Sequence, residues 1–284
     1  MLPLENLRLR PTYLSLCGGL KGRTVAMELA MSLTLALIIG LIVTATSFLS
    51  GLFGMAGGLI LIGALLALLP VATAMVLHAV AQIASNAWRG LLWREHIRWR
   101  AVAAYVLGCS LALLAWSLIQ YVPSRPMALI LLGVTPFLTH LAPASLKPNP
   151  ESFLQGTVYG SSCMSLMVLT GVAGPLLDAY FLGGRLDRRE IVATKAMCQI
   201  IGHAMKLAYF GVLIEQAGTL DPFVALVAVG ASLAGTVLAR PLLLAMSDAQ
   251  YRLWAGRIIM AIAVYYVLHG AALIQAQTPQ TAAM

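Results

Sequence analysis

The residues best suited to chemistry form a polar face on one otherwise apolar stretch, RREIVATKAMCQIIGHAMKLAYFG at residues 188–211. This face consists of Lys195, Gln199, His203 and Lys206. At 3.6 residues per turn of helix, the four side chains fall within a sector of roughly 80°. Ionisable groups at membrane depth are costly unless they face a cavity, water or a partner, so the face predicts a substrate or ion pathway. The alternative is that both lysines reach opposite interfaces and His203 is a satisfied core histidine.

The composition is that of a membrane protein with several spans. Of the 284 residues, 60% are hydrophobic and only 10% are charged, whereas a soluble domain carries about 25% charged residues. Because every backbone group in lipid must be paired internally, and the apolar runs are too long for barrel strands, we expect an all-α fold. The net charge of +8 is not a nucleic-acid signal, because the basic residues lie in short loops, where they encode orientation.

About ten helical segments are expected. The second and the seventh are too short to cross a bilayer as single helices. The expected segments are 28–50, 58–70, 72–92, 101–121, 127–142, 152–170, 175–183, 190–212, 222–245 and 251–275.

Each short segment follows a glycine cluster, GLFGMAGG at 51–58 and GVAGP at 171–175. Glycine lets a helix break within the membrane and lets backbone approach a ligand, and a proline in the first turn needs no N–H partner. Two interrupted segments at matching places in two halves predict a transporter's binding site, where the helix N-termini suit an oxyanion. The alternative is close helix packing. The predicted residues are Gly54, Gly57, Gly58, Gly171, Gly174 and Pro175.

The two halves align weakly but in order, which predicts a repeat. We expect a leader or tail at 1–27, repeat 1 at 28–145, repeat 2 at 146–276 and a tail at 277–284. The loop at 93–100 is basic, but its partner at 214–221 carries only acids, while the uncharged loop 68–73 has a basic partner at 185–190. If basic loops are cytoplasmic, paired loops face opposite sides, so the repeats are inverted. The basic leader does not fit this orientation.

The same alignment gives the third segment a second polar face. His78 corresponds to Gln199, Gln82 to His203 and Ser85 to Lys206. We predict that His78, Gln82 and Ser85 line one cavity together with the face of the eighth segment. Asn86 could line the cavity or pack. Arg89 shares the helical face of His78, Gln82 and Ser85 but is expected to reach the cytoplasmic interface.

Asp178 lies in the short seventh segment, where a carboxylate needs a partner, a metal or a proton. One interpretation is an ion pair with Lys195 or Lys206. The other is that Asp178 or His203 carries a coupling proton, so that a proton gradient drives anion movement.

Other chemistry has little support in the sequence. Cys17, Cys109, Cys163 and Cys198 stand alone, without metal-ligand spacing, and are expected to be reduced packing residues. We expect no metal, no cofactor and no cleaved signal peptide. The motif GxxxxGK[ST] is absent, so this chain is not expected to consume ATP itself.

Several motifs together resemble the sulfite exporter TauE/SafE family of membrane anion transporters. They are GLFGMAGGLILIGALL, GVAGPLLDAYFL, the REHIRW loop and KLAYFG, and the likeness covers roughly residues 30–270. The first cluster departs from the family's GxGGG by carrying Ala56 and Leu59. The resemblance implies transport of sulfite, organosulfonates or related anions across the bacterial inner membrane, and it makes a homodimer plausible.

The leading hypothesis is therefore a secondary anion transporter that works by alternating access. A membrane subunit or channel that does not transport would leave the Lys/His face unexplained. An intramembrane enzyme is the least favoured class, because HExxH, GxSxG and a compact Cys/His/Asp set are all missing from the sequence.

Overall fold

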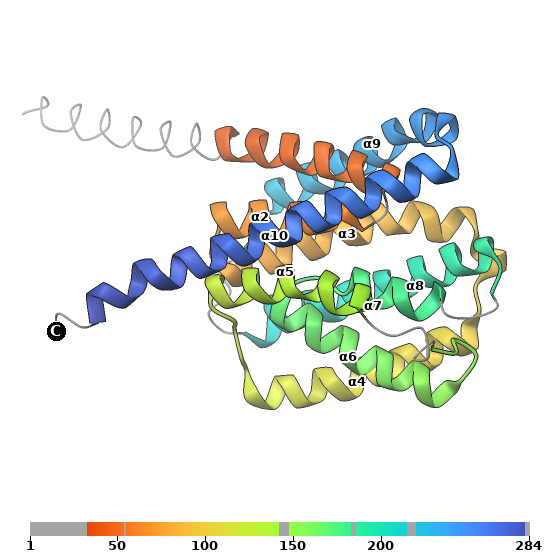
Figure 1. Cartoon of the computed structure of the whole chain (residues 1–284), viewed down its shortest axis with the longest axis horizontal. Coiled ribbons are helices and arrows are strands. Elements are labelled where there is room, and N and C mark those ends of the chain that lie inside the picture. The colour runs from red at the N-terminus through yellow and green to blue at the C-terminus, as the bar shows by residue number, and fades with distance from the viewer. Residues whose placement is uncertain (1–32, 54, 142–147, 183–185, 215–219, 282–284) are drawn as a thin grey trace, which may run out of the picture. The chain divides into compact units, whose positions relative to one another are not determined.

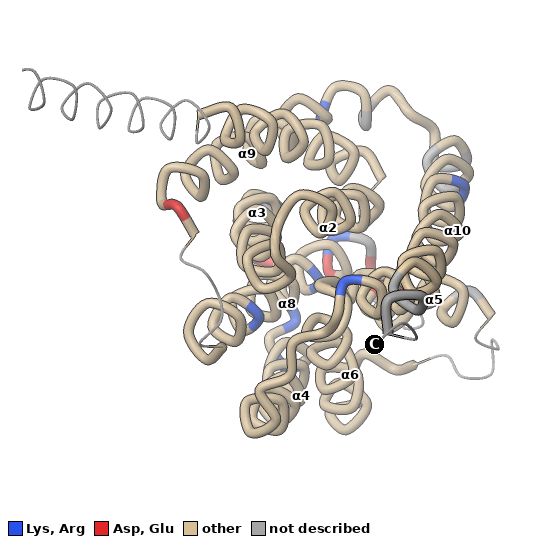
Figure 2. The backbone as a smooth tube through the Cα atoms, turned by 90° about the vertical axis from the view of Figure 1, so that its left-hand side faces the viewer, with Lys and Arg blue, Asp and Glu red and all other residues tan. Residues whose placement is uncertain are grey.

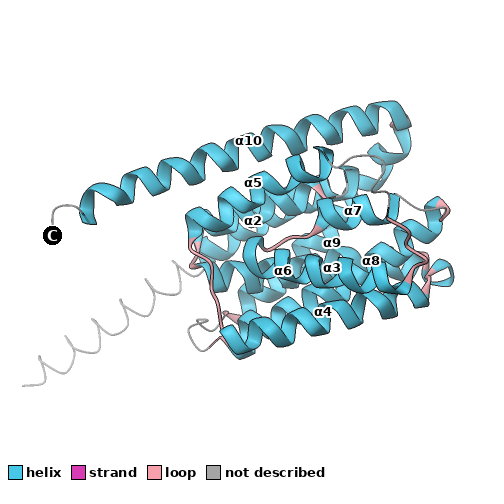
Figure 3. Cartoon of the chain, turned by 60° about the horizontal axis from the view of Figure 1, so that its bottom comes forward, coloured by secondary structure: helices cyan, strands magenta, loops and turns pink. Residues whose placement is uncertain are grey.

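The computed structural model describes residues 33–53, 55–141, 148–182, 186–214 and 220–281. Within these ranges the regular elements are helices, and no strand occurs (Figures 1 and 3). Five of the described helices are long and apolar enough to cross a membrane. The predicted fold class, an all-α polytopic membrane protein with about ten helical segments, is confirmed.

Two compact units can be distinguished, residues 1–39 and residues 40–284. Residues 33–39, the described part of the first unit, are helical. The second unit begins within the helix Leu33–Phe53. It continues with α2 (Ala56–Leu68), α3 (Val71–Leu92), η1 (Arg94–His96), α4 (Trp99–Ile119), α5 (Arg125–Leu141), α6 (Phe153–Thr170), α7 (Gly174–Leu182), α8 (Arg188–Ala208), the π-helical turn η3 (Tyr209–Leu213), α9 (Pro222–Ala245) and α10 (Asp248–Thr281).

The two short segments are present where the glycine clusters predict them. Helix α2 has 13 residues and α7 has 9, so at 1.5 Å per residue they are only about 20 Å and 14 Å long. A bilayer's hydrocarbon core is about 30 Å thick, and neither helix can cross it alone. At least one end of each helix must therefore lie within the thickness of the membrane, surrounded by other parts of the protein.

The long helices pack in pairs. Helix α3 lies against α8, α4 against α6, and α5 against α10. Helix α9 packs on residues 40–53 of the first described helix, where Ser47 Oγ donates to Ser232 Oγ at 3.1 Å. Glycines allow close approach, since a Cβ on Gly235 would lie 2.9 Å from the Phe48 nitrogen.

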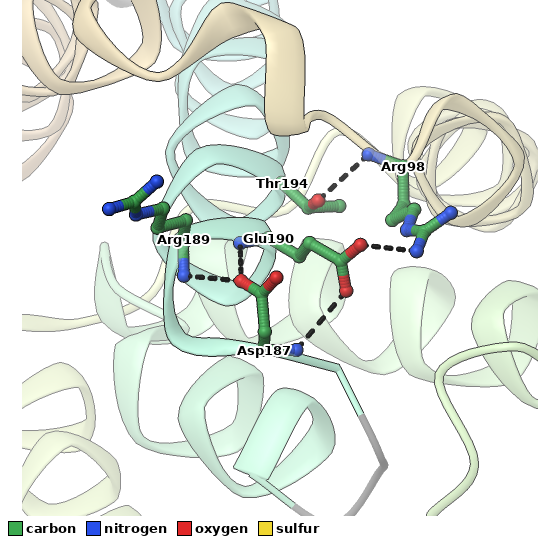
Figure 4. A network of polar contacts seen from close by, with 5 residues as sticks. All are labelled: Arg98, Asp187, Arg189, Glu190 and Thr194. Atoms are coloured by element: carbon green, nitrogen blue, oxygen red, sulfur yellow. Dashed lines mark hydrogen bonds and ion pairs between the residues drawn. The ribbon is translucent and has the colours of Figure 1, made fainter.

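Charged residues are sparse along the described backbone (Figure 2), and several of them fix the start of α8 (Figure 4). The Asp187 carboxylate accepts hydrogen bonds from the backbone N–H groups of Arg189 and Glu190, and Glu190 accepts one from the Asp187 N–H. This is a capping box. Glu190 also pairs with Arg98, whose backbone N–H donates to Thr194 Oγ1 at 3.0 Å. The start of α8 is therefore tied to the loop that precedes α4.

Two further predictions can be compared with the structure. Cys109, Cys163 and Cys198 are buried free thiols, which confirms their packing role, whereas Cys17 lies outside the described residues. Helix α10 runs to Thr281, beyond the predicted end at residue 275. Glutamine and alanine at residues 275–277 have good intrinsic helix propensity and extend the helix beyond its apolar run, whereas Pro279 in the last turn does not favour helix.

Candidate functional site

The first break is the start of α2. Its first three N–H groups belong to Ala56, Gly57 and Gly58, and the first turn of a helix offers no intrahelical acceptor for such donors. A Cβ on Gly57 would collide with the backbone around Thr46 and Ser50, and one on Gly58 would collide with the Gln82 amide. Glycine is therefore required at position 57, whereas a larger residue at position 58 would displace the Gln82 side chain. Gly54 lies outside the described residues.

The second break separates α6 from α7. Gly171 follows α6 with a φ of 87°, which is a left-handed conformation that favours glycine. The Thr170 hydroxyl donates to the Val172 carbonyl at 2.9 Å and holds the connection. Helix α7 then begins at Gly174, and Pro175 occupies its first turn, where the missing N–H costs nothing.

The two breaks lie against each other. A Cβ added to Gly174 would be 2.9 Å from the Cβ of Met55, the residue that precedes α2. The two short helices therefore begin at adjacent points of the second unit, although their first residues are more than 110 positions apart in the sequence.

A small cavity lies where the breaks meet. Six residues predicted to bind the substrate line it, namely Gly58, Gln82, Gly174, Pro175, Gln199 and His203. They come from α2, α3, α7 and α8. The cavity volume is about 20 Å³, which leaves room for about one water molecule.

Other predicted residues lie behind this lining and connect the two breaks. His78 Nε2 is 3.1 Å from the Gly58 carbonyl oxygen, and His78 Nδ1 is 2.8 Å from Lys206 Nζ. Lys206 Nζ also donates to the Gly171 carbonyl at 2.8 Å. Because a carbonyl oxygen can only accept, Nε2 of His78 carries the proton and donates to Gly58, which leaves Nδ1 to accept from Lys206 Nζ. A chain of hydrogen bonds thus joins the first turn of α2 to the residue after α6.

The two side chains that form this row of hydrogen bonds are fully buried. His78 and Lys206 are both 0% exposed. The rings of His78 and His203 lie with centroids 5.4 Å apart, and His203 lines the cavity whereas His78 does not. Gly57, Gly171 and Ser85 are also outside the cavity lining, and Ser85 Oγ is 3.1 Å from Thr236 Oγ1 of α9.

Asp178 forms an ion pair with Lys195, one of the two partners that the sequence suggested. Lys195 lines the cavity and Asp178 does not. The cation therefore reaches the cavity and its counter-ion lies behind it.

Arg89 and Asn86 also line the cavity, and the sequence did not place Arg89 there. Arg89 was expected at the cytoplasmic interface, but its guanidinium donates to Ser85 Oγ at 3.2 Å. Its place in the lining was not predicted, because a helical wheel does not show where along α3 the breaks of α2 and α7 lie. The signal for Arg89 was its position on the face of His78 and Gln82.

Two buried polar atoms of the cavity residues have no hydrogen-bond partner among the described residues. They are Asn86 Oδ1 and His203 Nδ1. Buried polar atoms are normally satisfied by protein or by a bound species. The site therefore combines two helix N-termini, two cationic side chains and two unused hydrogen-bonding atoms.

A second hollow of about 490 Å³ lies next to the cavity. Met55 and Pro175 line both. The larger hollow is mostly apolar, and the polar residues Arg257 and Thr139 are part of its lining.

No cluster of three His, Cys, Asp or Glu side chains suited to a metal occurs in the described part of the chain. The cavity lining instead includes the starts of two helices and the cationic side chains of Arg89 and Lys195, groups that can donate hydrogen bonds to an anion.

Residues 16–266 match the protein-family model described as Sulfite exporter TauE/SafE. This match covers most of the chain, and the chain belongs to this family. The family is a transporter family, so the chain is a multi-pass membrane protein of the anion-permease type. Neither curated proteins nor solved structures give a match to this chain.

Proposed function

We propose that this protein is a secondary transporter of small sulfur-containing anions, sulfite or organosulfonates, across the bacterial inner membrane. The observation that carries the proposal is the single cavity at which α2 and α7 both begin, lined by Arg89 and Lys195. Each helix N-terminus acts as about half a positive charge, and its free N–H groups suit oxyanion oxygens. Family membership supports the same class of solute.

The helix contacts support two inverted repeats. The third helix of each half, α3 and α8, pack together, as do the fifth helices, α5 and α10. The contact of α4 with α6 has its counterpart in α9 with residues 40–53. Two halves related by a two-fold axis produce this pattern, in which each contact between the halves has an equivalent contact with the halves interchanged. The difference in charge between paired loops favours an inverted orientation of the two halves.

Alternating access would then use the boundary between the two hollows. Met55 and Pro175 separate the small cavity from the larger hollow beside α5 and α10. An oxyanion needs more than the present 20 Å³, so the starts of α2 and α7 must move apart when it binds. Rocking of one repeat against the other would supply that movement.

Sulfite flux in proteoliposomes tests this proposal. The purified protein should catalyse counterflow, in which unlabelled sulfite on one side drives labelled sulfite uptake from the other. A channel gives no counterflow, and a subunit that does not transport gives no flux, so either result would contradict the proposal.

Proton coupling through Asp178 or His203 is part of the same proposal. With an imposed pH gradient, we expect sulfite flux to follow the gradient and Asp178→Asn to uncouple it. If the flux ignored the gradient while Asp178→Asn remained fully active, the proton would have no role. The proposed homodimer requires a separate mass measurement in detergent.

A further inference from the structure

Asn86 presents a hydrogen-bond acceptor whose orientation is fixed. The residue is 1% exposed, belongs to α3 and lines the cavity. Its Nδ2 donates to the Gln82 carbonyl oxygen at 2.8 Å. The reverse amide orientation would set two acceptors against each other, so Oδ1 must be the end without a partner among the described residues.

The surroundings of Asn86 are dominated by donors. The starts of α2 and α7, Arg89 and Lys195 all contribute to the same lining. These donors suit an oxyanion, but an anion with only acceptor oxygens would leave Asn86 Oδ1 unsatisfied or facing another oxygen. Leaving a buried acceptor without a donor is more costly than the average hydrogen bond is stabilising.

We propose that the site selects oxyanions that carry their own hydrogen-bond donor, a hydroxyl or a protonated oxygen, and that Asn86 Oδ1 accepts from it. For sulfite, the bound form is then hydrogen sulfite. This inference rests on the proposed function, because it takes the cavity to be the anion site. Asn86 becomes a specificity residue, and Arg89 and the helix N-termini bind the negative oxygens.

A water molecule is the competing partner for Asn86, since the cavity volume of about 20 Å³ admits one. In that case Asn86 would contribute nothing to the choice between anions. The two accounts differ in how the protein treats two anions of equal charge and similar size, one with a hydroxyl and one with a methyl group.

The test is calorimetric titration of the purified protein with hydroxymethanesulfonate, ethanesulfonate and sulfite. We expect hydroxymethanesulfonate to bind at least about tenfold more tightly than ethanesulfonate. Asn86→Leu should remove this preference by weakening only the hydroxylated anion. Asn149→Leu, the same change at an exposed loop position, should leave it intact.

The outcomes separate the two proposals, and the wild-type comparison holds even if a variant fails to fold. If sulfite binds and hydroxymethanesulfonate gains nothing over ethanesulfonate, the inference is overturned and the proposed function stands. An unchanged preference in folded Asn86→Leu also overturns it. If none of the three anions binds, the proposed function itself is overturned.

Discussion

Lys195 and Lys206 lie on one face of α8, eleven residues apart, and the structure gives them different surroundings. The Lys195 side chain is 19% exposed, lines the cavity and pairs with Asp178. Lys206 is 0% exposed and lies outside the lining, where its Nζ bonds His78 Nδ1 and the Gly171 carbonyl. Lys195 can therefore meet a solute directly, whereas Lys206 holds the two breaks in place.

The difference shows that a polar helical face in a membrane need not be one binding site. Only the part of α8 level with the starts of α2 and α7 faces the cavity. Lys206 binds backbone that a break has left without helical partners, a support that broken helices require in lipid. Direct contact of Lys206 with the substrate stays a prediction, and in this conformation its partners are protein groups.

The comparison predicts that Lys206→Met destabilises the protein far more than Lys195→Met does. Replacing Lys206 leaves His78 Nδ1 and the Gly171 carbonyl buried without partners, for a loss of about 2–5 kcal/mol. Replacing Lys195 removes a partly exposed ion pair, so the loss should be smaller. Denaturant or thermal unfolding of both variants in the same detergent measures the difference. Equal stability of the two variants would refute the distinction.

On the cavity side, Arg89→Gln should lower the affinity for sulfite by about 10–100-fold while the fold remains stable. The reason is that hydrogen bonds from a charged donor contribute about 1.5–3 kcal/mol. Titration calorimetry with sulfite measures the effect.

Arg257→Gln is the matched control for this change. Arg257 lines the larger hollow and stacks over Trp254 at 5.8 Å. Its replacement should leave the equilibrium affinity for sulfite unchanged. A loss as large as that of Arg89→Gln would move the anion site into the larger hollow.

At the start of α8, we expect replacement of the N-cap residue Asp187 to change the stability of the protein only slightly. The pKa of Asp187 is lowered mainly by the hydrogen bond from the backbone N–H of Glu190, and further by the one from the N–H of Arg189. A carboxylate with a lowered folded-state pKa stabilises above its unfolded pKa, and this contribution is lost as pH falls through the folded-state pKa. Asp187→Ala should therefore lower the Tm slightly at neutral pH, and the difference from wild type should shrink in acid.

Asp187→Asn is the control, because asparagine also caps helices but does not titrate. It should keep most of the neutral-pH stability. If Asp187→Ala and wild type unfold at the same temperature at neutral pH, the cap does not contribute to stability.

The sequence predicted the helical breaks well, because glycine clusters and short apolar runs are local features. It also gave Lys195 as one candidate partner for Asp178, and the ion pair confirms it. It did not predict the partners of Lys206, since the register of α8 against α3 depends on packing between distant segments. The role of Asn86 was ambiguous for the same reason. It lies about 100° from Ser85 around the helix, so it could line the cavity or pack against another helix until the position of α2 is known.

Sulfite binding to glycine variants of the two breaks tests the central claim that both form one anion site. Gly58→Ala and Gly174→Ala place a methyl group against Gln82 and Met55, respectively, whereas Gly230→Ala meets nothing within 4 Å. The account predicts that calorimetry will show sulfite binding lost in both break variants and unchanged in Gly230→Ala. Wild-type affinity in either folded break variant would contradict it.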